Sequence, residues 1–109
     1  AKLVDVGPCG YARNLCDGIV RARLRDPERL SLLSPGEVVR YEIDLGPTSN
    51  LFLPGHAIRV EISSSNFPRF DRNLNTGEDF ATGTRIAKAE QAVHHGKRYP
   101  SRIVLPVIP

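Results

Sequence analysis

Histidine and cysteine supply the most versatile side-chain chemistry in this 109-residue sequence, which contains three histidines and two cysteines. A histidine serves as a general base near neutral pH only when a nucleophile and an orienting group lie within reach. His56 follows a Pro-Gly pair, whereas His94 and His95 precede a Gly-Lys-Arg turn. Since a histidine in a polar loop is more often solvated than catalytic, a nucleophile must be sought before any of the three is given a role.

No serine occupies the strand-to-helix turn that activates a hydrolase nucleophile. That turn has the pattern G-x-S-x-G, and the serines lie instead in RLSLL, LLSPG, PTSNL, EISSSNF and YPSRI. The glycine-rich patterns that hold phosphates or dinucleotides are also missing from the sequence. An enzyme complete within these residues therefore has no motif to support it.

Cys9 and Cys16 allow three interpretations, namely free thiols, a disulfide across a hairpin, or part of a metal site. A zinc site would need two more ligands, but His94 and His95 are adjacent and would point to opposite faces of a strand. The six-residue spacing of the cysteines is also unusual for zinc. We therefore expect free thiols, and we predict no catalytic, cofactor-binding or metal-binding residue and no cofactor for this chain.

The loop Asn66–Asn73 interleaves phenylalanines and arginines, a combination that can stack on bases and contact phosphates. The alternative is that Phe67 and Phe70 anchor the loop while its arginines pair with carboxylates or carbonyls. Asp71 lies between the arginines and the net charge of the chain is only +3, whereas nucleic-acid sites show an unopposed basic face. We therefore favour the anchored loop and predict no nucleic-acid partner.

Carbohydrate recognition must be weighed because sugars stack on exposed aromatic rings. The chain has no Trp, three Tyr and four Phe, and Tyr41 is expected to face inward. A module that binds carbohydrate or another polymer therefore stays an alternative function. No apolar run approaches the roughly 20 residues that span a membrane, so no membrane partner is predicted.

Apolar and polar residues alternate with a period of two in three segments, which is typical of strands with one wet face. In 19–25, Val20, Ala22 and Leu24 alternate with Arg21, Arg23 and Arg25. In 39–45, Val39, Tyr41, Ile43 and Leu45 alternate with charged residues. In 58–62, Ile58, Val60 and Ile62 alternate with Arg59 and Glu61.

Two further segments have strand composition. Lys2–Val6 is short and aliphatic, and the turn-forming Gly7-Pro8-Cys9-Gly10 follows it. The segment 103–108 is apolar on both faces and is expected to be a buried strand, with Pro106 at an edge or bulge. Thr84–His95 fits a helix and a strand equally, and 64–79 is a long polar loop without periodicity.

These elements predict an all-β domain of five to six short antiparallel strands, arranged as a sandwich or barrel. Nine Gly and nine Pro supply frequent turns. Surface scaling predicts that about 65% of the extended chain's surface can be buried, which is enough for one core. The sequence contains no Met and begins in a strand, so we expect it to be part of a longer chain.

Long stretches of the sequence resemble the C-terminal domain of the cocaine-esterase-like (CocE/NonD) serine hydrolases, which include X-Pro dipeptidyl-peptidases. The resemblance covers nearly the whole chain, in 3–26, 34–78 and 99–109. Its most specific phrases are DLGPTSN, PGHAIRVEISSSNFPRFDRN and PSRIVLPVIP. The turn GPCG departs from the family pattern, where an acidic residue would suit better.

The resemblance implies that residues 1–109 form a C-terminal jelly-roll β-sandwich, similar to galactose-binding-like domains and incomplete here. Its partners would be the α/β-hydrolase and cap domains of a parent serine hydrolase that acts on ester, acyl-amide or Xaa-Pro bonds. The catalytic triad would lie in the hydrolase domain, so no catalytic role passes to His56, His94 or His95. The implied function is a structural buttress, and the compartment is left open.

An incomplete sandwich leaves open sheet edges and uncovered apolar surface. We therefore expect that the chain can form a homo-oligomer through these edges. Sedimentation at high protein concentration checks this expectation, and a strictly monomeric species would contradict it.

Overall fold

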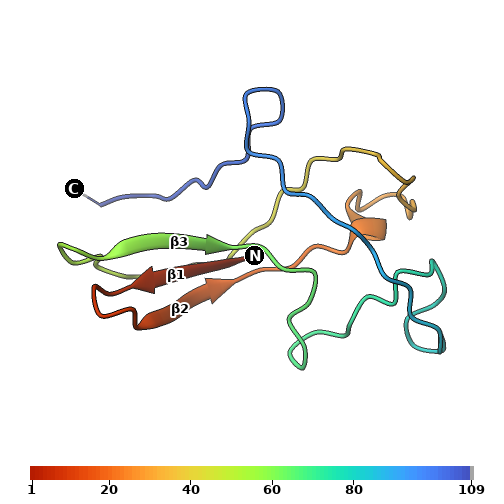
Figure 1. The fold of residues 1–109 in the computed structure, drawn as a ribbon, viewed down its shortest axis with the longest axis horizontal. Helices are drawn as coiled ribbons and strands as arrows, with labels where there is room; N and C mark the ends of the chain where they lie inside the picture. Colours follow the sequence, from red (N-terminus) through yellow and green to blue (C-terminus); the bar gives the residue numbers. More distant parts are fainter. Residues whose placement is uncertain (109) are drawn as a thin grey trace. The chain divides into compact units, whose positions relative to one another are not determined.

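The structure is a computed structural model that describes residues 1–108, so Pro109, the last residue of the predicted domain, lies outside the described residues. Its regular elements are β1 (Lys2–Val6), β2 (Ala12–Asp17), the 3-10 helix η1 (Ala22–Leu24) and β3 (Ala57–Glu61) (Figure 1). The chain divides into two compact units, Ala1–Ser63 and Ser64–Pro109. All four elements belong to the first unit.

The three strands form one antiparallel sheet in the order β2-β1-β3, with β1 at its centre. The turn between β1 and β2 closes through hydrogen bonds from Gly10 N to Gly7 O (2.9 Å) and from Gly7 N to Tyr11 O (2.8 Å). Gly10 adopts φ 85°, a conformation that favours glycine. The predictions of a strand at Lys2–Val6 and of a turn after it are therefore confirmed.

Strand β2 was not expected from the sequence, and a bulge explains why. Leu3 lies opposite Cys16 and Val4 lies opposite Asn14, so Leu15 is an extra residue on β2. An extra residue shifts every side chain beyond it to the other face. The segment ARNLCD therefore shows no alternation, although it pairs along its length.

The register gives the sheet two different faces. One face carries Leu3 and Asp5 from β1, with Val60 and Ile58 opposite them on β3. The other face carries Val4 beside Arg59, whose Nη2 lies 2.8 Å from Glu61 Oε1. The strand predicted for 58–62 is thus confirmed over Ala57–Glu61. Burial does not alternate along it, because Ile58, Arg59 and Val60 are exposed and Glu61 is half-buried.

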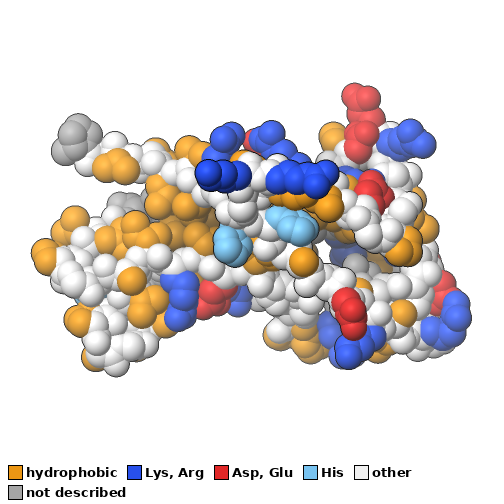
Figure 2. All heavy atoms as spheres, turned by 45° about the horizontal axis from the view of Figure 1, so that its top comes forward, with side chains coloured by type: hydrophobic (Ala, Val, Ile, Leu, Met, Phe, Trp, Pro, Cys, Tyr) orange, Lys and Arg blue, Asp and Glu red, His pale blue; other side chains and the backbone are white. Residues whose placement is uncertain are grey.

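The core is confined to the central strand. Leu3 and Val4 are the buried hydrophobic residues of the described chain, with relative exposures of 2% and 3%. Many large apolar side chains remain at the surface, where Figure 2 shows them between the charged groups. The accessible surface is 9247 Å², about half of the roughly 17,400 Å² of an extended 12.0 kDa chain. Burial therefore falls short of the 65% that length alone predicted.

The prediction of a strand at 19–25 is wrong, because the backbone there closes into the turn η1. Leu24 N donates to Arg21 O at 2.9 Å. The Arg25 guanidinium holds this geometry, since its Nη1 donates to the carbonyl oxygens of Ala22 and Ser31, each at 2.8 Å. The predicted faces also differ, because Leu24 is 49% exposed whereas Arg25 is half-buried.

The segment 39–45 is not a strand either, although burial partly follows its predicted alternation. Val39, Ile43 and Leu45 are half-buried and the residues between them are exposed. No backbone ladder joins this segment to another in the described residues. Tyr41, expected to face inward, is 38% exposed. The alternation here predicts which side chains of the extended segment are less exposed. A strand also needs a neighbouring segment to which its backbone can hydrogen-bond.

The unit Ser64–Pro109 contains no regular element in its described part. The predicted strand at 103–108 is therefore wrong, and Val104, Val107 and Ile108 are 80–93% exposed. Thr84–His95 is neither helix nor strand, and 64–79 is an irregular loop as predicted. Three strands are present in the described residues rather than five to six.

Candidate functional site

Asp5 is the buried charged residue of the described chain, with a relative exposure of 5%. It lies in the middle of β1, between Arg13 of β2 and Ile58 of β3. A carboxylate taken out of water must be paired and hydrogen-bonded to be tolerated. The groups that pair with Asp5 therefore define the most unusual polar cluster of the first unit.

Three side chains contact the Asp5 carboxylate. His56 Nδ1 lies 2.7 Å from Oδ1, Asn50 Nδ2 donates to Oδ2 at 3.2 Å, and Arg13 Nη2 lies 3.8 Å from Oδ2. Arg13 also donates to Asn50 Oδ1. We call these four residues the Asp5 network.

The register explains why His56 reaches Asp5. Ile58 lies directly opposite Asp5, and His56 precedes Ile58 by two residues, so both share one face of the sheet. His56 is thus the diagonal neighbour of Asp5, a position within reach of a long side chain. The turn at Pro54-Gly55, where Gly55 adopts φ 82°, delivers His56 to the start of β3.

These contacts favour the ionised form of Asp5. The hydrogen bond with His56 is the main cause that holds the pKa of the Asp5 carboxyl below its ordinary value, and burial acts in the opposite direction. Asn50 and the nearby cations lower the pKa further. The carboxylate is therefore stabilised in the folded state at neutral pH.

We expect the stability of the first unit to fall with acid because of this carboxyl. A group with a lowered native pKa stabilises the fold above its ordinary pKa, here 3.8, and loses that contribution as the pH falls through the native pKa. Urea unfolding of the wild type and of Asp5→Asn between pH 2 and pH 6 checks this. The wild type should be more stable at pH 6, and the difference should shrink below pH 3.8. A gap that stays constant with pH would contradict the assignment.

A shallow hollow of about 260 Å³ adjoins the Asp5 network. Beyond the network residues, its wall includes the strongly exposed Tyr11 (69%), Leu51 (77%) and Leu53 (51%). In an Asp-His pair such as this, the aspartate could orient the histidine as a general base. Acyl transfer also needs a nucleophile within hydrogen-bond reach of that histidine. In the described structure, the residues lining this hollow include neither serine nor cysteine. The arrangement can position groups and bind, but it does not assemble a triad.

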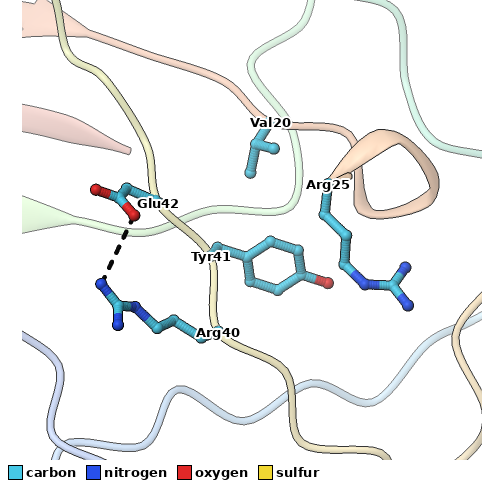
Figure 3. A pocket seen from close by; sticks show the side chains of 5 residues that line it. All are labelled: Val20, Arg25, Arg40, Tyr41 and Glu42. Carbon is cyan, nitrogen blue, oxygen red and sulfur yellow. Dashed lines mark ion pairs between the residues drawn. The ribbon is translucent and has the colours of Figure 1, made fainter. Parts of the chain in front are cut away.

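A second hollow, of about 370 Å³, is lined by Val20, Arg25, Arg40, Tyr41 and Glu42 (Figure 3). Arg40 pairs with Glu42 at 3.6 Å, although both side chains are largely exposed. Arg25 is engaged by carbonyl oxygens and lies 3.7 Å from Glu37. Burial is the main cause that raises the pKa of the Tyr41 phenol. These contacts all join residues within the segment 22–42. They therefore favour a structural role for the side chains that line this hollow.

The aromatic-basic loop is organised by its own side chains. The Arg69 guanidinium lies 5.5 Å from the Phe70 ring centroid, and that of Arg72 lies 5.7 Å from the Phe67 centroid. Phe70 is half-buried, but Phe67 is 65% exposed, so the anchoring predicted for Phe67 is wrong. The stacked arginines explain how an exposed ring is partly covered.

The remaining predicted candidates do not converge. The ring of His94 lies 5.3 Å from that of Tyr99, and His95 is exposed. Cys9 and Cys16 are free thiols, which confirms the favoured interpretation. Residues 1–108 contain no cluster of three or more His, Cys, Asp or Glu that could hold a metal ion, and no helix there is long and apolar enough to cross a membrane.

Sequence reasoning singled out His56 but missed Asp5, Arg13 and Asn50. The sequence did contain one signal for Asp5, because a carboxylate interrupts the aliphatic run LVDV. If this run is the central strand of a sheet, the carboxylate has a strand on each side of it. The partner residues carried no local signal, since the contacts join positions up to 51 residues apart.

Comparison with known proteins defines the class of this chain. The family described as the X-Pro dipeptidyl-peptidase C-terminal non-catalytic domain matches residues 1–104. The chain belongs to this family.

Individual relatives agree with that assignment. The chain is 50% identical to a cocaine esterase of Rhodococcus sp. over 111 residues, which cover 99% of this chain and 19% of the relative. It is 34% identical over 124 residues to proteins of Mycobacterium bovis and Mycobacterium tuberculosis that are named as serine esterases, covering 97% of this chain and 18% of each. The chain thus spans about a fifth of the length of these relatives.

Proposed function

We propose that this chain serves as a structural buttress within a larger serine hydrolase, and that residues 1–109 act as one C-terminal domain of it. The observation that carries the proposal is the match of a non-catalytic domain family to residues 1–104, together with relatives about five times longer. The Asp5 network agrees with this role, because its histidine and carboxylate face a hollow whose described lining lacks a nucleophile.

The proposed architecture is a jelly-roll β-sandwich of which the three strands form one layer. The support is the face of the sheet that carries Leu3 and Asp5, because its aliphatic residues Ile58 and Val60 are 53% and 42% exposed. A sheet with one wet and one apolar face is stable when a second layer covers the apolar one. The domain would pack on the α/β-hydrolase and cap domains of the parent chain.

In the proposed parent enzyme, hydrolysis proceeds by acyl-enzyme chemistry with residues outside this chain. The bond cleaved would be an ester, an acyl-amide or an Xaa-Pro peptide. The domain contributes indirectly, because a rigid support keeps catalytic groups within the fraction of an ångström that their geometry requires.

Hydrolysis of a chromogenic ester tests the proposal. The natural longer chain should turn over p-nitrophenyl acetate, while residues 1–109 alone should give the buffer rate. Asp5→Asn in the longer chain should lower the temperature at which activity is lost more than it lowers turnover at 20 °C. Turnover by residues 1–109 that is abolished by His56→Ala would overturn the assignment of all chemistry to other domains.

Carbohydrate binding is a second candidate, because one observation favours it. Tyr11 is 69% exposed at the hollow that also contains Arg13 and His56, which combines an aromatic platform with polar groups. Calorimetric titration with mono- and oligosaccharides should then give saturable heats that Tyr11→Ala removes. The control is Tyr99→Ala, because Tyr99 lies in the other unit. An absence of heat with the unsubstituted chain rejects this candidate.

A further inference from the structure

The positive charge of the chain is concentrated in its second unit. Residues 1–63 contain eight Lys or Arg and eight Asp or Glu, whereas residues 64–109 contain seven and four. The first unit is therefore neutral, and the whole net charge of +3 belongs to the second. From 91 to 109 the sequence has no Asp or Glu, and we call residues 94–102 within it, HHGKRYPSR, the basic turn. The basic turn carries three permanent cations, Lys97, Arg98 and Arg102.

These three cations have no carboxylate beside them. All three side chains are exposed, and none of them forms an ion pair in the part of the chain that the structure describes. Arg85 of the same unit, by contrast, pairs with Glu78. Neighbouring charges of one sign create a local field that attracts anionic groups. The basic turn is therefore complementary to a surface that carries negative charge.

Contacts within the basic turn hold its shape. Ser101 Oγ donates to the carbonyl oxygen of His94, which ties the two ends of the narrow blue loop in Figure 1 together. The ring of Tyr99 lies 5.3 Å from the ring of His94, and the Arg98 guanidinium lies 5.2 Å from the Tyr99 centroid. A guanidinium stacked on a ring keeps its N–H groups in one plane, where they can bind an anion in pairs. Such preorganisation reduces the entropy lost on binding.

The number of cations distinguishes between the classes of anionic partner. Proteins with strongly salt-dependent DNA binding make about 6–10 phosphate contacts. Segments that bind anionic lipid surfaces carry clusters of about 4–8 Lys or Arg. Three permanent cations fall short of both, but they suffice for a few ion pairs at a protein interface. Arginine forks fit carboxylates in a planar, paired geometry, so a carboxylate surface of a protein is the partner that fits best.

We propose that the basic turn docks on a cluster of Asp or Glu side chains in the longer chain outside residues 1–109. This inference rests on the proposed function, which places these residues in a larger enzyme, and it names the surface and the charge of one contact between domains. The first unit does not supply the cluster, because it is neutral overall and its buried carboxylate, Asp5, is already paired with His56. Complementary charges fix the orientation of two surfaces, because wrong pairings are penalised.

Zero-length cross-linking of the natural longer chain tests the proposal. A carbodiimide joins a lysine amine to a carboxylate in contact with it, and the reagent takes up the water that is lost. The chain has three lysines, so Lys2 and Lys88 are internal controls for Lys97. Peptide mass mapping should find Lys97 joined to Asp or Glu outside residues 1–109, and should find no such link for the two controls. Raising NaCl from about 0.05 M to about 0.5 M should lower the yield, because salt screens exposed charges.

Charge reversal gives a matched pair of variants in the same longer chain. Arg98→Glu should lower the yield of the Lys97 cross-link at least about fivefold, because it replaces an attraction by a repulsion. Lys88→Glu makes the same change of charge at an exposed position of the same unit outside the basic turn, so it should leave the yield unchanged. Equal yields in the two variants would overturn the proposal.

The position of the cross-link decides the identity of the partner. A Lys97 that forms no link, or that links only within residues 1–109, would overturn the proposal. A link between an isotopically labelled copy and an unlabelled one would also overturn it, because a second copy would then be the partner. Binding of the longer chain to DNA or to phosphatidylserine vesicles that Arg98→Glu abolishes, without a Lys97 link, would overturn it in favour of a phosphate partner.

The docking contact and the proposed enzyme can fail separately. A Lys97 link outside residues 1–109, in a longer chain that hydrolyses no ester, would support the docking contact and reject the proposed enzyme. Ester hydrolysis by a longer chain in which Lys97 forms no such link would reject the docking contact alone.

Discussion

Leu3→Ala is expected to lower the unfolding free energy of the first unit by about 2–5 kcal/mol, the cost of emptying a well-packed core position. Leu3 is 2% exposed and lies on the central strand between Cys16 and Val60, so its truncation removes buried apolar contacts at the centre of the sheet. Only Leu3 and Val4 form the buried hydrophobic core of the described chain. The loss is therefore a large share of the roughly 5–15 kcal/mol that a domain has.

Urea unfolding followed by circular dichroism measures this loss. Leu51→Ala is the matched control, because Leu51 is 77% exposed and its truncation should change stability by less than about 0.5 kcal/mol. Similar midpoints for the two variants would show that β1 is not the centre of the core.

Two elements could be predicted from the sequence because their signal is local. Lys2–Val6 is a short aliphatic run followed by turn residues, and 58–62 alternates cleanly after Pro-Gly; both are strands in the structure. Such patterns depend only on the side-chain period of an extended chain.

The predictions for the other segments failed for identifiable physical reasons. Strand β2 could not be predicted from the sequence, because the bulge at Leu15 breaks the alternation of side chains within it. The segment 39–45 alternates well but finds no neighbour in the described residues, and the segment 103–108 is apolar but exposed. A strand needs a partner, and the composition of a segment does not say whether that partner belongs to the same chain.

The Asp5 network shows the same limit at the level of a site. His56 was visible as a titratable residue after a turn, but its role depends on a register that places it diagonally from Asp5. Asn50 and Arg13 complete the pairing from two other segments. The resemblance to a hydrolase family correctly predicted the family, yet these four residues could be joined only by the fold.

Gly18→Ala is expected to destabilise the first unit by about 3 kcal/mol, near the upper end of the usual cost of overpacking. A Cβ on Gly18 would lie 1.9 Å from the carbonyl oxygen of Asp44 and 3.1 Å from Cγ2 of Ile43. The nearest obstacle is backbone, which cannot rotate away as a side chain would. Gly18 N also donates to Ala1 O at 3.0 Å, so a shift of Gly18 would disturb the end of the β1–β2 pair.

The close approach of the Asp44 carbonyl to Gly18 shows that the segment 39–45 passes next to the end of β2, although no ladder joins them. Gly18→Ala should therefore loosen 39–45 first, and hydrogen exchange should show faster exchange there than in β1. Gly96→Ala is the matched control, because nothing lies within 4 Å of a Cβ at Gly96. Its melting temperature should equal that of the unsubstituted chain. If Gly18→Ala also melts unchanged, then the close approach of these two segments does not exist in solution.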